Sequence, residues 1–179
     1  MLIRGFLSPE DVLRQIDLRE GTMIGDFGAG SGHFAIAMAK IVGNYGKIFA
    51  IDVREASLES VRSRARMANL ANINYIRANL EIAGATEIAD GILDLVILIT
   101  VLSQSNKKEE ILKEALRVLK RGGKLLVVEW SQTGPAFASS HEYRITKEDM
   151  QKIIEGVGFK LDKELDVKSF HYGFLFVKS

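Results

Sequence analysis

The sequence predicts an α/β fold: a doubly wound, mostly parallel sheet that carries helices on both faces and has an antiparallel strand at its far end. Three observations predict it. Short apolar segments alternate with segments whose apolar residues recur at helical spacing, as in parallel strands joined by helices. A glycine-rich loop follows the first apolar segment. Near the C-terminal end, two strand-like segments are joined by too few residues for a parallel crossover, so they should pair antiparallel.

The first elements are a helix, a strand, a glycine loop, a second helix and a second strand. Ser8 is a favourable N-cap with proline after it, and the apolar pattern predicts a short helix that ends near Glu20. Residues 22–27 are short and apolar enough for a strand. Residues 34–42 are almost wholly apolar, as in a helix packed on a sheet, and 47–52 read as the next strand.

The middle of the chain continues the alternation. Strands are expected at 73–78, at 93–99, which reads as fully buried, and at 124–130. Lys120, Arg121 and two glycines should end the helix before the last of these strands. Apolar faces mark the two helices of this region: Leu58, Val61, Ala65 and Ala68 in the first, and Ile111, Leu112, Ala115, Leu116, Val118 and Leu119 in the second.

The C-terminal part begins with a helix whose start and stop are both marked. Thr146 with Asp149 resembles a capping box, and Gly158 should end the helix. Strands at 159–168 and 172–178 follow without a helix between them, and they should form the antiparallel pair.

The composition is that of one globular domain. The chain has 179 residues, 47% of them hydrophobic, with 24 Lys and Arg against 23 Asp and Glu and no Cys. We expect a single domain over 1–179, with a short N-terminal helical cap at 1–20. The lack of cysteine excludes disulfide frameworks, thiolate zinc sites, iron–sulfur clusters and a cysteine nucleophile. The balanced charge predicts no DNA-binding surface and no affinity for anionic membranes.

A glycine loop occupies residues 28–32, between the first strand and a helix, where doubly wound sheets bind ligands. Its spacing differs from the dinucleotide fingerprint G-x-G-x-x-G, because residue 33 is His and the third glycine comes one position early. A P-loop pattern is absent as well. Asp52 ends the second strand about 20 residues beyond the loop, where a carboxylate can bind two ribose hydroxyls. Together these features predict a ligand that contains adenosine.

Nearly the whole chain resembles the class I S-adenosylmethionine-dependent methyltransferases. Residues 26–32 look like that family's acidic-x-Gly-x-Gly-x-Gly loop, which holds the methionine end of the cofactor, and 49–52 look like its ribose-binding strand. Residues 78–80 fall where the family contacts adenine, with Asn in the place of the usual Asp, and 119–128 look like its helix, turn and strand. The resemblance implies a seven-stranded sheet with the last strand antiparallel, and S-adenosyl-L-methionine as cofactor. The cofactor-binding residues that it implies are Asp26, Phe27, Gly28, Ala29, Gly30, Gly32, Asp52, Val53, Asn79, Leu80 and Ile99.

The residues expected to contact a methyl acceptor are fewer. Residues 139–144 are polar and follow the fifth strand, at the sheet edge where the family binds acceptors, and 141–144 and 171–174 resemble the ubiquinone/menaquinone-biosynthesis-like sub-group. The substrate candidates are His33, His141, Arg144 and Tyr172. No pair of the three histidines has helical metal-ligand spacing, so we expect no metal. Because the cofactor brings its own leaving group, no dedicated catalytic residue is obligatory, and none is assigned.

The leading hypothesis is methyl transfer to a small organic acceptor, because the insertions between expected elements are short. Residues 100–103 lack the Asn or Asp, two prolines and aromatic residue of amine methyltransferases. Lack of cysteine disfavours arsenite methylation and carbon methylation of pyrimidines through a covalent adduct.

Three other functions stay open: methylation of protein or RNA, a cofactor-binding module without its own chemistry, and a nicotinamide-dependent reductase. Arg62 and Arg66 lie among glutamates, which favours a solvated mixed-charge helix over an RNA-binding patch. The N-terminal segment does not read as a signal peptide, and no apolar run approaches the roughly 20 residues that span a bilayer. We therefore expect a cytoplasmic protein without membrane contact; the oligomeric state is left open.

Overall fold

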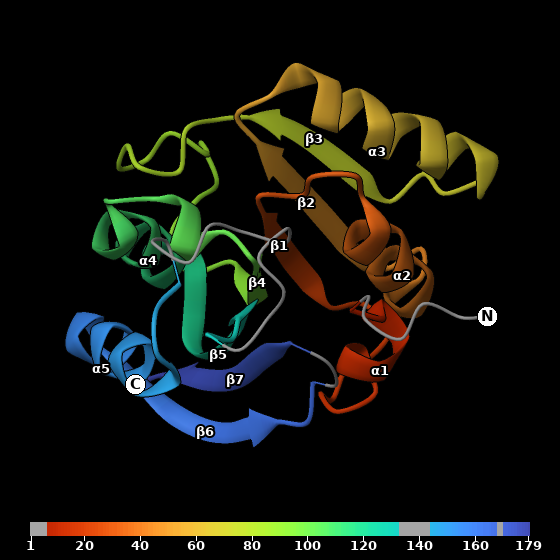
Figure 1. Cartoon of the computed structure of the whole chain (residues 1–179). Helices are drawn as coiled ribbons and strands as arrows, with labels where there is room; N and C mark the ends of the chain where they lie inside the picture. Colours follow the sequence, from red (N-terminus) through yellow and green to blue (C-terminus); the bar gives the residue numbers. More distant parts are fainter. Residues whose placement is uncertain (1–6, 133–143, 168–169) are drawn as a thin grey trace.

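Residues 7–132, 144–167 and 170–179 are described by the computed structural model of the chain. They form one seven-stranded sheet in the order β3-β2-β1-β4-β5-β7-β6 (Figure 1). Neighbouring strands are parallel, with the exception of β7, which runs antiparallel to both β5 and β6. The predicted fold class is therefore confirmed. The strands are β1 (Met23–Phe27), β2 (Lys47–Asp52), β3 (Ile73–Arg77), β4 (Leu93–Ile99), β5 (Leu119–Trp130), β6 (Phe159–Leu165) and β7 (His171–Lys178).

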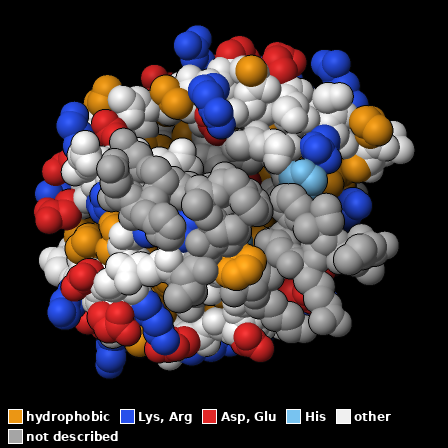
Figure 2. Space-filling view, viewed as in Figure 1, with side chains coloured by type: hydrophobic (Ala, Val, Ile, Leu, Met, Phe, Trp, Pro, Cys, Tyr) orange, Lys and Arg blue, Asp and Glu red, His pale blue; other side chains and the backbone are white. Residues whose placement is uncertain are grey.

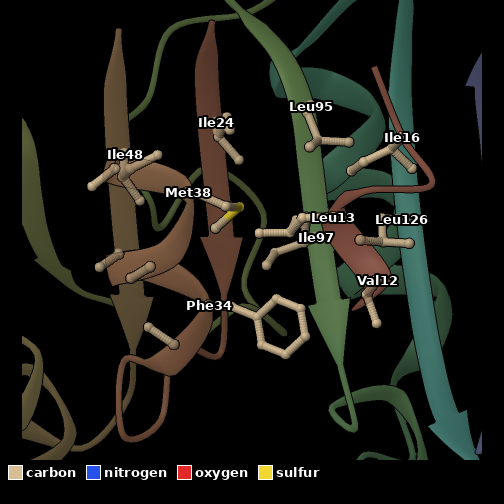
Figure 3. Packing of buried hydrophobic residues seen from close by; sticks show 14 of the residues in the cluster. Val12, Leu13, Ile16, Ile24, Phe34, Met38, Ile48, Leu95, Ile97 and Leu126 are labelled. Carbon is tan, nitrogen blue, oxygen red and sulfur yellow. The ribbon is translucent and has the colours of Figure 1, made fainter. Parts of the chain in front are cut away.

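Helices cover both faces of the sheet (Figure 1). One layer contains the buried side chains of α1, α2 and α3, and the other contains those of α4 and α5. Figure 3 shows the first layer, in which Val12 of α1 and Met38 of α2 lie over the sheet with Ile97 and Leu126. The helices are α1 (Pro9–Leu13), α2 (His33–Val42), α3 (Glu55–Met67), the 3-10 helix η1 (Leu102–Gln104), α4 (Lys108–Val118) and α5 (Lys147–Val157). None of those described is long and apolar enough to cross a membrane.

The first helix is shorter than the sequence suggests. Ser8 caps it as expected, but α1 ends at Leu13 rather than near Glu20, so that expectation was wrong. The N–H groups of Gln15 and the residue after it bond carbonyls three residues back, a 3-10 pattern that tightens the chain. The Gln15 side chain then exchanges two hydrogen bonds with the backbone of Asp166, between β6 and β7. This contact lies 151 residues away in sequence, so no local signal announces it.

The junction of α4 and β5 also differs from the expectation. The helix ends at Val118, and β5 begins at Leu119 rather than at Lys124, so the residues expected to stop the helix lie inside the strand. The register with β4 shifts there, and Gly122 adopts a φ of 74°, as an irregularity in a strand often requires. Pairing with β4 thus overrides the local stop signal.

The carbonyls at the end of α4 are bonded by a distant lysine instead of by the helix's own cations. Lys178 Nζ, at the end of β7, donates to the carbonyls of Leu116 and Leu119 at 2.7 Å each. The Leu116 carbonyl is one that a helix leaves without an intrahelical partner, and Leu119 is the first residue of β5. The contact therefore closes α4 from the far end of the chain.

The C-terminal elements follow the local signals. The Thr146 side chain accepts a hydrogen bond from the Asp149 N–H at 3.1 Å, and Gly158 ends α5 with a φ of 118°. The antiparallel pairing of β6 and β7 confirms the expectation drawn from their short connection.

Candidate functional site

The glycine loop turns sharply between β1 and α2 and is fixed by β2. Two successive N–H groups, the first from Gly28, donate to the Ile51 carbonyl at 2.8 and 2.9 Å. Gly28 and Gly30 have φ values of 81° and 52°, which favour glycine. A Cβ at Gly28 would lie 2.6 Å from a methyl of Val101, whereas one at Gly30 would meet nothing nearer than 3.9 Å. The loop is packed on one side and leaves room for a ligand to approach the backbone at Gly30.

Asp26 is the second-last residue of β1 and has its carboxyl group inside the protein. The residue is 2% exposed, and its Oδ2 atom has no hydrogen-bond partner. Burial, and secondly the negative charge of Asp52, raises the pKa of Asp26 to about 7. A buried acceptor without a donor is unfavourable for folding, so its presence at this position points to a ligand that brings a donor or a positive charge.

Asp52 stands at the end of β2 and ties the loop to that strand. Its Oδ2 accepts a hydrogen bond from the Gly30 N–H at 3.0 Å, and its Oδ1 accepts one from the Arg54 N–H at 2.9 Å. The guanidinium of Arg54 also lies 3.6 Å away and is largely exposed. Because each carboxylate oxygen has a second lone pair, Asp52 can still accept hydrogen bonds from two hydroxyls of a ribose.

The other predicted cofactor residues border this region with different exposures. Val53 and Asn79 are exposed, and the Asn79 side-chain oxygen accepts a hydrogen bond from the backbone two residues on, at 3.0 Å. Leu80 is buried, and Ile99 ends β4 partly covered. Phe27 has its side chain in the core, so only its backbone is available to a ligand.

The described acceptor candidates fall in two regions: His33 on α2, and Arg144 with Tyr172 beside the end of β5 and the start of β7. His33 is exposed in the first turn of α2 and lines an open groove of about 1460 Å³ between α1, α2 and α3. Arg144 is buried and donates to two backbone carbonyls just after β5, at 3.2 and 3.3 Å. The Tyr172 hydroxyl donates to the carbonyl of Ile145 at 3.2 Å, in the layer of α4 and α5. His141 lies outside the described residues.

Sequence reasoning missed two buried polar groups at the carboxyl edge of the parallel strands. In the described ranges, the buried side-chain atoms without a hydrogen-bond partner are Asp26 Oδ2, Asn72 Oδ1, Glu129 Oε2 and His171 Nδ1. All except the Asn72 atom belong to residues at this edge, because β7 runs antiparallel and starts there. The sequence signal for Glu129 is a glutamate directly after a buried apolar run. His171 begins the segment 171–174 that resembles the sub-group, but only Tyr172 of that segment was named as a candidate.

The segment after β4 reaches the same edge with a strained backbone. Thr100 has a φ of 55°, which β-branched residues rarely adopt. Strain of this kind clusters at functional sites. Further on, the Ser103 N–H donates to Glu129 Oε1 at 3.2 Å, and burial raises the pKa of Glu129. These contacts fix the segment against β5.

Charged side chains of both signs are mixed among the described residues on the face shown in Figure 2. On the face in Figure 2, Lys and Arg side chains alternate with Asp and Glu around the rim, and the coloured residues form no extended basic area. Within the described ranges, no group of three or more His, Asp or Glu residues is arranged to hold a metal ion.

A family model described as a methyltransferase domain matches residues 18–169. This chain belongs to that family. The resemblance found in the sequence is thereby confirmed: the chain is a methyltransferase domain of the S-adenosylmethionine-dependent class, and S-adenosylmethionine is its cofactor.

Curated relatives of this methyltransferase domain include the ubiquinone/menaquinone biosynthesis C-methyltransferase UbiE of Haemophilus ducreyi. It is 35% identical over 116 residues, which are 64% of this chain and 44% of the relative. The chain thus matches less than half the length of that relative. The match confirms the sub-group similarity noted in the sequence.

Solved structures show the same fold at lower identity. A SAM dependent methyltransferase from Aquifex aeolicus has a TM-score of 0.87 and 22% identity, covering 97% of this chain and 90% of that chain. The [4+2]-cyclase SpnF has a TM-score of 0.81 and 17% identity, covering 95% and 79%. Since a cyclase shares the fold, function has to be argued from the site.

Proposed function

We propose that this methyltransferase domain transfers the methyl group of S-adenosylmethionine to a small organic acceptor of the quinone-related kind for which its curated relatives are named. The observation that carries the proposal is the buried, unpartnered carboxyl group of Asp26 beside the open backbone of Gly30. A positively charged group matches that carboxyl group, and the methionine end of the cofactor carries an ammonium group.

In this proposal, different residues of the chain bind different parts of the cofactor. Asp26 holds the ammonium group of the methionine end, because an opposite charge repays the burial of its carboxylate. Asp52 binds the ribose hydroxyls, and Asn79 and Leu80 contact the adenine. Gly30 lets the backbone approach the ligand, which a side chain there would obstruct.

S-adenosylmethionine, when bound, supplies a methyl group activated by a positively charged sulfur. The protein's contribution is to orient the acceptor and to exclude water. Val101 packs against Gly28, which places the strained segment after β4 next to the cofactor loop. An acceptor seated over that segment lies beside the methionine end of the cofactor.

A calorimetric titration with S-adenosylhomocysteine tests the cofactor half of the proposal. Asp26→Asn should weaken binding at least tenfold, because one charge-assisted contact contributes roughly 1.5–3 kcal/mol. Asp94→Asn is the matched control, since Asp94 lies at the other end of the sheet and bonds the Met23 N–H at 2.8 Å. NADH should not bind.

The acceptor half is tested by transfer of a labelled methyl group to 1,4-naphthohydroquinone and 1,4-benzohydroquinone, with bulk RNA and a protein extract in parallel. We expect label in a quinol. Label in RNA or protein only would contradict a small acceptor, and tight S-adenosylhomocysteine binding without transfer to any of them would favour a binding module.

A further inference from the structure

Trp130 and His171 form an aromatic stack where β5 ends and β7 begins. They are register partners across the two strands, and their ring centroids lie 3.9 Å apart at an interplanar angle of 35°. The N–H of Ser131 donates to the Phe170 carbonyl at 2.7 Å, which extends the pairing by one step and fixes both backbones. Trp130 is partly exposed, and His171 is 9% exposed.

The stack lies on the same face of the sheet as the Asp26 carboxyl group. Side chains alternate along a strand, so Trp130 faces the same layer as Val128, which packs with α1 and α2. Asp26 likewise follows Ile24 of that layer by two residues. His171 shares the face of Trp130 because the two rings are in contact.

Apolar side chains accompany the stack on this face. In Figure 3, Val12 of α1 and Phe34 of α2 lie toward the arrowheads of the parallel strands, the end at which Trp130 stands. Glu129 and Tyr172 are the preceding register pair, so they face the opposite layer. The face of the sheet that carries Asp26 therefore combines, at one edge, the carboxylate proposed to bind the cofactor, apolar side chains and an aromatic stack.

His171 has a free hydrogen-bond acceptor at this place. Its Nδ1 is buried without a partner, and burial lowers the pKa of His171 to about 4, which keeps the imidazole neutral near pH 7. A neutral imidazole with its proton on Nε2 presents a lone pair on Nδ1. The same combination of burial and missing partner marks Asp26 Oδ2, the atom assigned above to the cofactor.

We propose that Trp130 and His171 form the specificity wall of the acceptor site: a flat ring of the acceptor packs against the Trp130 indole, and its hydroxyl group donates a hydrogen bond to His171 Nδ1. This inference rests on the proposed function, since it assigns residues to the acceptor of that reaction. The wall selects a ring with a free O–H over the same ring without one, because the latter leaves Nδ1 unpaired.

The chain contains one tryptophan, so the fluorescence of Trp130 reports directly on this site. The protein, saturated with S-adenosylhomocysteine, is titrated with catechol and with its dimethyl ether, with excitation at the red edge of indole absorption. We expect catechol to change the Trp130 emission and to bind at least tenfold more tightly than the ether.

Substitutions of His171 test whether the preference for catechol over its dimethyl ether depends on Nδ1. His171→Phe keeps an aromatic ring on Trp130 but has no acceptor, so catechol should bind no better than the ether. His171→Asn provides an amide oxygen near the position of Nδ1 and should restore part of the preference. Tyr45→Phe is the control, because Tyr45 is 84% exposed between α2 and β2 and its loss of a hydroxyl should leave both affinities unchanged. His171→Leu replaces His171→Phe if the latter does not fold.

S-adenosylhomocysteine binding, measured by calorimetry in every variant, separates the two proposals. If the wild-type protein does not bind it, the proposed function fails. If the wild-type protein binds it but its emission is unmoved by catechol, the inference about Trp130 and His171 is wrong. It is also overturned if a folded His171→Phe or His171→Leu variant prefers catechol as strongly as the wild type.

Discussion

Replacing Asp26 by Asn should stabilise the protein without its cofactor and weaken cofactor binding at the same time. The carboxyl group is buried with an unpartnered oxygen, so its ionised form is unfavourable in the folded protein until a cation arrives. Asn has nearly the same shape and no charge. The substitution therefore isolates the contribution of the charge.

The magnitude follows from the pKa. Burial raises the pKa of Asp26 from 3.8 to about 7, and each pH unit corresponds to about 1.36 kcal/mol, so ionising Asp26 at pH 8 costs about 4 kcal/mol of folding free energy. Because the pKa of Asp26 is higher in the folded than in the unfolded protein, its neutral carboxyl group contributes stability that is fully present below pH 3.8. This stability is lost as the pH rises through about 7. For a chain of this length, about 4 kcal/mol corresponds to a Tm difference of roughly 8–16 °C.

The assay is urea unfolding of the wild type and Asp26→Asn at several values between about pH 4 and about pH 8, followed by circular dichroism. The quantity compared is the difference between the two free energies of unfolding, because contributions from Glu114 and Glu129 cancel in it. The difference should be near zero at the acidic end and should grow to about 4 kcal/mol in favour of Asp26→Asn at the alkaline end.

Cofactor binding gives the second half of the test. In the wild type, S-adenosylhomocysteine should bind about tenfold more weakly for each pH unit below 7, because binding requires the ionised carboxyl group. Asp26→Asn should bind weakly at every pH. A stability difference that does not change with pH would refute the reasoning about burial, and unaltered S-adenosylhomocysteine affinity would refute the role of Asp26 in binding.

Three further predictions concern other parts of the fold. Glu114→Gln should lower the free energy of unfolding in urea by about 3 kcal/mol and leave S-adenosylhomocysteine affinity unchanged. Buried Glu114 accepts hydrogen bonds from Thr86 and Gly84 at 2.6 and 2.9 Å, and it pairs with Arg117. Gly28→Ala should abolish S-adenosylhomocysteine binding in calorimetry, because the new Cβ would meet Val101. Adding Val101→Ala should restore part of the binding. Full binding by Gly28→Ala alone would contradict the packing described. Lys178→Met should lower the Tm by a few degrees, roughly 1 kcal/mol, by freeing the Leu116 and Leu119 carbonyls at the junction of α4 and β5. An unchanged Tm would contradict a stabilising role for this contact.

Local patterns predicted the elements whose boundaries depend on local chemistry. The bounds of β2 and β4 agree with the expectation, because a glycine turn precedes the first and the second is a continuous apolar run. The cap at Thr146 and the stop at Gly158 agree for the same reason. Asp26 and Asp52 could be singled out because the loop between their strands constrains both.

Long-range contacts decided what the sequence could not predict. The end of α1 depends on Gln15 meeting Asp166, and the end of α4 depends on Lys178. The stack of Trp130 on His171 requires the register of two strands that are separated by α5 and β6 in the chain. A single sequence carries no signal for such a register, so His171 could be listed as a histidine but not placed at a site.

The contact between Gly28 and Val101 joins the cofactor loop to the segment that follows β4. In the proposed function the loop holds the cofactor and the segment holds the acceptor, so Val101, next to the strained Thr100, is the contact through which a displacement of one would reach the other. The cofactor and the acceptor are then thermodynamically coupled. The factor by which bound cofactor changes the affinity for the acceptor equals the factor by which bound acceptor changes the affinity for the cofactor. Equilibrium titrations of each ligand with and without the other would measure this factor from both sides.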